Sequence, residues 1–296
     1  MVNTGIFSLL LVLCGHAQLK KFYSLHDDSL FDTVNFTLHA TSGHSYFRSV
    51  PSQNALNIYG NPDLERINPS FDAKVVGKAC NVNLNLNEYR TSGLGDGLAF
   101  AVLSDASRED ESNYWKMLVS DSKVYNLDLF YGIGTSDIDL SGTAINHLKV
   151  TTGSAEVKLN YDRMRPNTIS MDTLMVKADL GTLTAEDLYQ SRAEHIIANI
   201  GFGKVALDFT RPMNNKCLVE ATVGAGQLKV LLPRDAPVII YINESPLCGV
   251  TIARDFEEVE KNVFVNMNYA AEAENLLTLE IDVAMGNAML VYAERR

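Results

Sequence analysis

The residues that could perform catalysis are few. Glu186 and Asp187 are adjacent carboxylates, and glycosidases use a pair of carboxylates, one as the acid and the other as the base or nucleophile. That chemistry requires two carboxyl groups held about 5 to 10 Å apart in a cleft, and nothing in the sequence indicates a cleft. The chain also lacks a Gly-x-Ser-x-Gly elbow, an HExxH motif, a P-loop and a dinucleotide-binding fingerprint. We therefore predict no catalytic residues, no enzymatic activity and no cofactor.

Three histidines stand at positions where a metal ion could be bound. His39 and His44 flank Gly43 and could approach one another across a turn, but the sequence offers no third ligand for a metal such as zinc. His195 precedes an apolar pair at 196–197, and we expect it at the edge of a strand. The sequence therefore predicts no metal site at these histidines.

Two acidic segments could hold calcium. Asp137 and Asp139 flank Ile138, so both carboxylates should point outward from the same face of one strand. Residues 93–97 read Gly-Leu-Gly-Asp-Gly, which is both glycine-rich and acidic. A solvated strand face and a turn are the ordinary roles of such segments, and we expect these roles rather than a metal site.

The elements that position these residues follow a repeat punctuated by glycine. Gly203 stands between two sets of alternating apolar residues, Ile196, Ala198 and Ile200 before it and Val205, Leu207 and Phe209 after it. The same offsets recur around Gly226 and Gly286, and shorter copies surround Gly134, Gly153, Gly181 and Gly249. A period of two is typical of a strand with one buried face. A glycine between two such strands allows a positive φ or a close backbone approach at a corner.

The intervals between these glycines are nearly constant. Gly181 and Gly203 are 22 residues apart, and the next two intervals, to Gly226 and then to Gly249, are 23 residues each. Units of this length hold a strand, a corner, a second strand and a return, and they bury their apolar faces only by stacking. We therefore predict an all-β fold, a parallel β-solenoid (β-helix) with rungs of roughly 22 residues. The alternative is an antiparallel sandwich, but its hairpin signals are limited mainly to 96–97.

The N-terminal half follows the pattern more loosely. Asparagines alternate with apolar residues over 81–87, and stacked asparagines can form hydrogen-bonded ladders along a solenoid. Residues 104–113 are the best candidate for a loop, and residues 270–274 could form a turn beside the sheet. We divide the chain into an N-terminal β region at 18–120, continuous with the solenoid or packed on it, and a toast-rack-like β-solenoid at 121–296.

The first seventeen residues predict export. The apolar run at 5–13 is shorter than the roughly 20 residues that a membrane-spanning helix needs. Small residues at Gly15 and Ala17 suit a signal peptide, 1–17, that is cleaved after Ala17, although no Lys or Arg precedes the run. Two alternatives stay open, a lipid anchor on Cys14 and a retained apolar end. We expect no transmembrane span later in the chain.

The cysteines and the net charge exclude further classes. Without the signal peptide the chain keeps Cys80, Cys217 and Cys248, too few for a disulfide framework. One bridge between Cys217 and Cys248 could form in an oxidising compartment. The formal net charge of -11 argues against a nucleic-acid partner and against electrostatic docking on anionic lipid.

Residues 115–293 resemble a known family. Four segments are similar to the C-terminal domain of LiaF-type cell-wall-antibiotic-response proteins, namely 224–233, 236–240, 248–252 and 277–288. Three more resemble the N-terminal part of toast-rack proteins, namely 125–129, 132–134 and 138–142. The resemblance, which extends to adhesin-type domains of bacterial envelope proteins, implies a right-handed β-solenoid used in adhesion or in sensing envelope stress. LiaF-type proteins carry membrane helices ahead of this domain, and the predicted signal peptide here argues against direct inhibition of a membrane kinase.

Three functions are consistent with these observations. The preferred one is a non-catalytic exported protein, in the periplasm or at the cell surface, that recognises an envelope glycan or protein. The second is a carbohydrate-active enzyme, a polysaccharide lyase or hydrolase on a β-helix scaffold, which would need a groove carrying several carboxylates. The third is a structural module that self-associates through its terminal rungs. Because the motifs specify fold better than activity, the sequence predicts no particular binding residues.

Overall fold

The computed structural model describes residues 21–62, 66–88 and 113–293. Within these ranges the protein is all-β, and its one helical element is a short 3-10 turn, η1 (Leu188–Ser191). No helix in the described ranges is long and apolar enough to cross a membrane. Residues 270–274 form a hydrogen-bonded turn in which Ala273 N donates to Ala270 O, as expected.

Most strands belong to two ladders of parallel strands. Ladder A consists, in spatial order, of β5 (Ala79–Glu88), β2 (Thr33–Ser49), β7 (Val124–Asp139), β8 (Ala144–Thr152), β10 (Met171–Ala178), β12 (Ala193–Ile200), β14 (Cys217–Val223), β20 (Leu277–Val283) and β16 (Val238–Glu244). Ladder B consists of the C-terminal halves of β2 and β7, then β9 (Glu156–Asn160), β11 (Thr182–Ala185), β13 (Lys204–Asp208), β15 (Gln227–Leu232), β21 (Asn287–Tyr292) and β17 (Gly249–Ile252). This pairing confirms the all-β class and the mostly parallel strands that were predicted, and it contradicts an antiparallel sandwich.

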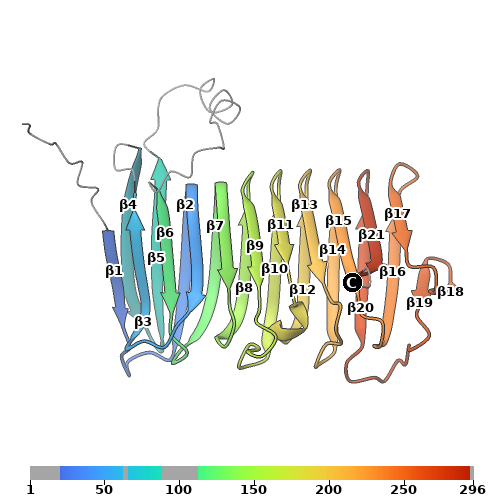
Figure 1. Ribbon diagram of the computed structural model, residues 1–296, viewed down its shortest axis with the longest axis horizontal. Coiled ribbons are helices and arrows are strands. Elements are labelled where there is room, and N and C mark those ends of the chain that lie inside the picture. Colours follow the sequence, from blue (N-terminus) through green and yellow to red (C-terminus); the bar gives the residue numbers. More distant parts are fainter. Residues whose placement is uncertain (1–20, 63–65, 89–112, 294–296) are drawn as a thin grey trace, which may run out of the picture.

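Antiparallel strands are present at both ends of the stack. At the N-terminal end, β6 (Tyr114–Val119) pairs in parallel with β2, and β3 (Asn54–Asn61), β1 (Lys21–His26) and β4 (Ile67–Val76) add antiparallel pairs. At the other end, β19 (Val263–Val265) and β18 (Glu257–Glu260) pair antiparallel beside β16. Figure 1 shows the units side by side along the long axis of the molecule, with tight corners along one long edge and longer connections along the other.

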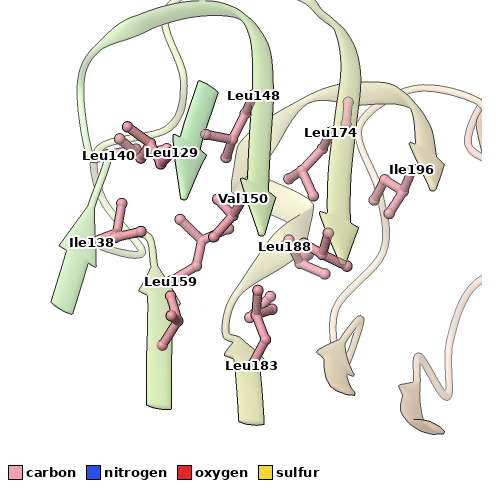
Figure 2. Close-up of a cluster of buried hydrophobic side chains, with 14 of the residues drawn as sticks. Leu129, Ile138, Leu140, Leu148, Val150, Leu159, Leu174, Leu183, Leu188 and Ile196 are labelled. Carbon is pink, nitrogen blue, oxygen red and sulfur yellow. The ribbon is translucent and has the colours of Figure 1, made fainter. Parts of the chain in front are cut away.

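The core lies between the two ladders. Alternate residues of most strands in the two ladders are buried, as in β7, where Leu127 and Leu129 point inward between partly exposed neighbours. Figure 2 shows how Leu148 and Leu174 of ladder A pack in the same cluster as Leu159 of ladder B. The two-residue apolar alternation of the sequence therefore marks the buried face of each strand correctly.

The predicted glycine corners are present, and most are required by close backbone approach. Among the glycines at the corners between ladder A and ladder B, Gly43 and Gly134, where β2 and β7 bend, have a positive φ, of 115° and 116°. A Cβ at Gly203 would lie 2.4 Å from the carbonyl oxygen of Gly181. A Cβ at Gly226 would lie 2.4 Å from that of Gly203. Each carbonyl also accepts a hydrogen bond from the next unit, such as Lys204 N to Gly181 O at 2.9 Å.

The stacking order differs from the order predicted by spacing. Gly226 has Gly286 as its neighbour, not Gly249, because β20 and β21 lie between β14–β15 and β16–β17. The chain reaches this position only after passing through β16–β19, so adjacent units are 60 residues apart at Gln227↔Asn287. The prediction that the units of Gly226 and Gly249 are neighbours was thus wrong, since equal spacing in the sequence does not determine which units are adjacent.

Two of the seven glycine anchors also occupy a different corner position. Gly181, Gly203, Gly226 and Gly286 occupy equivalent positions in successive corners, which we call the glycine column. Gly249 is paired with Asn287 and therefore lies one residue beyond this column. In the unit of β8 and β9, the residue in the glycine column is Ala155, as shown by the close approach of Gly181 to its carbonyl oxygen. Gly153 lies earlier in that corner, and its N–H donates to Tyr131 O at 2.8 Å.

Of the asparagines at 81–87, Asn81 takes part in an asparagine ladder on the outer face of ladder A. Asn35 donates to Asn81 at 2.8 Å, Asn126 donates to Asn35 at 2.8 Å, and Asn146 donates to Asn126 at 3.2 Å. The ladder joins four neighbouring strands of the stack, β5, β2, β7 and β8. These amides satisfy each other's donors and acceptors, which ties the N-terminal strands β5 and β2 to the strands that follow them in the stack.

Candidate functional site

The paired carboxylates Glu186 and Asp187 are each held by a basic residue. Lys158 Nζ lies 3.0 Å from Glu186 Oε2, and Arg163 Nε lies 3.5 Å from Asp187 Oδ1. Asp187 adopts a left-handed conformation at the start of η1, and burial raises the pKa of its carboxyl above the ordinary value. The two side chains therefore serve separate ion pairs at the end of β11 and the start of η1, not one reaction centre.

The two outward carboxylates, Asp137 and Asp139, both form ion pairs with one arginine of the same chain. Arg48 on the neighbouring strand β2 places NH2 3.1 Å from Asp137 Oδ2 and NH1 3.3 Å from Asp139 Oδ2. Ser141 N donates to Asp139 at 3.0 Å. One guanidinium thus bridges both carboxylates. It lies where a calcium ion would have to bind if these two residues formed a metal site.

The histidines lie apart from one another. His39 shares a hydrogen bond with Asn87 and stacks on Phe130 at 4.5 Å, whereas His44, beyond the Gly43 bend, contacts Thr135 at 2.8 Å. The prediction that His195 lies at a strand edge is wrong. The residue lies within β12, which already begins at Ala193, and it is paired on one side with β10 and on the other with β14. Its Nε2 contacts a carboxylate oxygen of Glu220 on β14.

No three His, Cys, Asp or Glu side chains gather as a metal site within 21–62, 66–88 and 113–293. The acidic glycine run at 93–97 and most of the predicted loop at 104–113 lie outside the described residues.

The cysteines do not form the bridge that the sequence left open. Cys217 is buried at the start of β14, level with Leu277, whereas Cys248 follows β16, whose last residue is level with Val283. The two thiols are thus separated by the length of the strands, farther than a disulfide spans. Burial raises the pKa of Cys217 to about 12.

We expect a thiol reagent to distinguish these cysteines. Maleimide should label Cys248 well before Cys80 and Cys217, because the latter two are buried and burial raises the pKa of both thiols. Peptide mapping by mass spectrometry after timed labelling of the native protein measures the order. Early labelling at Cys217 would contradict its place in the core.

A groove on the outer face of ladder B, which we call the ladder B groove, was not predicted. It has a volume of about 440 Å³ and is lined by outward side chains of β13, β15, β21 and their neighbours. Its polar lining residues are Thr182, Lys204, Gln227, Lys229, Thr251 and Asn287. Ala206 and Gly249, which have small side chains or none, leave the space open between these longer residues, and Met289 adds an apolar surface.

The charge of the ladder B groove contrasts with that of the whole chain. Lys204 and Lys229 extend from adjacent strands, and neither forms an ion pair with any residue that the structure describes. Lys158, on the same face, is by contrast neutralised by Glu186. Two unpaired ammonium groups beside amides and hydroxyls can bind an anionic ligand that also carries hydroxyl groups.

A signal for the ladder B groove was present in the sequence. Lys204 follows Gly203 directly, and Lys229 stands three residues after Gly226. By alternation both side chains point away from the core, and superposing the glycine corners would have brought them to one face. Asn287 and Gly249 could not have been added this way, because their place depends on the order in which the last units stack.

Comparison with known proteins gives one structural similarity. No family model matches the sequence, so its resemblance to LiaF-type proteins stays a prediction. No curated protein matches it either. The fold is similar to the crystal structure of a "putative cell adhesion protein" from Clostridium sporogenes, with 13% sequence identity and a TM-score of 0.44, over 93% of this chain and 99% of that one.

Proposed function

We propose that this protein is a non-catalytic binding protein of the bacterial envelope, exported by cleavage after Ala17, that recognises an acidic envelope glycan. The observation that supports the proposal is the ladder B groove with its unpaired Lys204 and Lys229. The architecture that we propose for it is a right-handed solenoid of the toast-rack type, used in adhesion or in sensing envelope stress.

The chemistry of the ladder B groove favours an acidic glycan over other envelope components. Uronic acids combine carboxylates, which pair with ammonium groups, with hydroxyls, which match the side chains of Thr182, Gln227 and Asn287. The parallel stack is straight in Figure 1, and neighbouring strands lie roughly 4.8 Å apart, so an extended polymer could contact several units in turn.

The alternative, a carbohydrate-active enzyme, requires acid and base groups that are free to act on the substrate. Glu186 and Asp187 are each engaged by a basic side chain. None of the described residues that line the ladder B groove is a carboxylate. Binding without turnover is therefore the function that these residues support best.

Calorimetric titration with oligogalacturonate and with neutral dextran oligomers of similar length tests the proposal. We expect the protein to bind the uronate but not dextran, and to release no reducing sugar. Replacing Lys204 and Lys229 with Gln should weaken binding about tenfold, because each exposed charge pair contributes up to roughly 1 kcal/mol. Added salt should weaken binding by the wild type more than by the double variant.

The matched control is Lys158→Gln, which removes an already paired lysine from the same face and should leave the affinity unchanged. Equal affinity for dextran and uronate, an unaffected double variant, or release of reducing sugar would each contradict the proposal.

A further inference from the structure

A row of exposed apolar residues follows the edge of the molecule on which the tight corners lie. At the middle of successive corners stand Ile133, Leu180, Phe202, Met285 and Leu247, with Ser154 and Ala225 between them. We call these seven positions the corner row. The exposed fractions are 49% for Ile133, 66% for Leu180, 71% for Phe202, 60% for Met285 and 76% for Leu247.

The backbone holds the corner row in register. Leu180 N donates to Gly153 O, Phe202 N to Asp179 O, and Met285 N to Gly224 O, each at 2.8 Å. These corners therefore lie directly on one another, and the corner of Leu247 is held beside that of Met285 by bonds at its two ends, Ser245 N to Val283 O and Gly249 N to Gly286 O. Seven corners at about 4.8 Å extend over roughly 30 Å. Large apolar side chains that are aligned on a rigid surface differ from scattered exposed residues and are typical of a contact surface.

We propose that the corner row is a membrane-contacting edge that inserts its side chains into the interfacial region of a lipid bilayer. This inference is independent of glycan binding, because none of its seven side chains lines the ladder B groove. It also differs from the predicted self-association through terminal rungs, since the corner row runs along the stack, not across its ends.

The shape of the edge favours lipid over a second copy of the chain. Two facing sheets lie about 10 Å apart, so an edge roughly 10 Å wide and 30 Å long offers about 300 Å², against about 800 Å² per partner in a standard protein interface. A bilayer imposes no such requirement, because its surface adapts to a narrow convex row of apolar side chains.

The charges beside the corner row favour contact with uncharged lipid. Lys177 forms an ion pair with Asp179 at 3.1 Å, and Glu156, Lys204 and Asp282 add both signs at the flanks. Because these charges include no excess of positive charge that would attract anionic lipid, insertion is driven by the burial of apolar surface. It should therefore depend little on salt or on the content of anionic lipid.

Fluorescence of a Phe202→Trp variant of the full chain tests the inference directly. The native Trp115 is buried, so a change of emission on adding vesicles reports the introduced indole. With phosphatidylcholine vesicles we expect a blue shift and quenching by brominated acyl chains. Adding Leu180→Ser and Met285→Ser should weaken vesicle binding by about tenfold or more, because each loses part of its transfer free energy into the interface.

The control is Met164→Trp, in the connection between β9 and β10 at the opposite edge, where a residue that is 86% exposed lies outside the corner row. Its emission should not respond to the vesicles. Unchanged emission of the Phe202→Trp variant would overturn the inference. So would a blue shift that follows protein concentration without lipid, since that identifies a second copy as the partner.

Discussion

The Gly203→Val variant should lose about 3 kcal/mol of unfolding free energy. A Cβ at this position would lie 2.4 Å from the carbonyl oxygen of Gly181 and 3.1 Å from the Cβ of Ala178. Backbone atoms cannot rotate aside as a side chain can, so the two units must separate locally. Separation weakens the hydrogen bond from Lys204 N to Gly181 O as well as the core packing beneath it. The midpoint of urea denaturation measures the loss.

The neighbouring corner supplies a matched control for Gly203→Val. Ala225 lies in the middle of its corner, where a side chain points outward, so Ala225→Val should change stability by less than about 0.5 kcal/mol. Gly226→Val, one residue further, should behave like Gly203→Val, because its Cβ would lie 2.4 Å from Gly203 O. Equal midpoints for Gly203→Val and Ala225→Val would contradict the role assigned to the glycine column.

The Lys123→Met variant is expected to lose about 2 to 3 kcal/mol of stability. Lys123 is 9% exposed, and its ammonium donates to the carbonyl oxygens of Asp28 and Phe31 at 2.8 and 2.7 Å. It also lies 2.7 Å from Asp27 Oδ1. Methionine preserves the length and apolar stem of the side chain but leaves these three acceptors without their common donor. Thermal or urea unfolding measures the loss.

The same variant should change how stability depends on pH. The hydrogen bond from Lys123 lowers the pKa of Asp27 below its ordinary value. A carboxyl with a lowered folded-state pKa adds stability above its unfolded pKa of about 3.9 and loses it as the pH falls through the folded pKa. The wild type should therefore lose stability below about pH 4 more steeply than Lys123→Met does.

An exposed lysine provides the comparison for Lys123→Met. Lys78 lies 3.9 Å from Asp32, and its side chain is 74% exposed. Lys78→Met should change stability by less than about 0.5 kcal/mol at any pH. A similar loss in both variants, or parallel pH profiles for the wild type and Lys123→Met, would show that burial does not set the contribution of Lys123.

The distribution of charge on the outer faces bears on both proposals. Several acidic side chains that suggested chemistry in the sequence are neutralised by bases of adjacent units, as with Glu186 and Lys158 at 3.0 Å. In a parallel stack each residue lies next to its equivalents in the neighbouring units, so pairs of opposite charge form readily across strands. Lys204 and Lys229 differ from the paired bases in that no described acidic residue pairs with them, and both line the same groove.

The strands and their buried faces could be predicted from the sequence because the signals are local. Alternation around Gly203 and Gly226 reflects which side of a strand faces the core, and the glycine marks where the chain turns. The outward position of Asn81 follows from the same locality, since this residue alternates with buried neighbours. Neither inference required knowledge of which unit lies beside which.

The order of the units could not be predicted in this way. Gly226 and Gly249 are separated by the expected interval, yet β20 and β21 arrive from the end of the chain and stack between their units. Equal spacing is compatible with either order, because an apolar strand face packs against any neighbour of similar shape. The order in which the units stack is decided by the pairing of whole strands, which is a non-local property.

The sequence by itself therefore determined the all-β class, the alternation of buried and exposed residues and the need for glycine at the corners. Only the tertiary structure decided that Arg48 would bridge Asp137 and Asp139, and that Lys204, Lys229 and Asn287 would line one groove. The physical reason is that backbone periodicity depends on near neighbours in the chain. A binding surface on a stack depends on the order in which distant units are brought together.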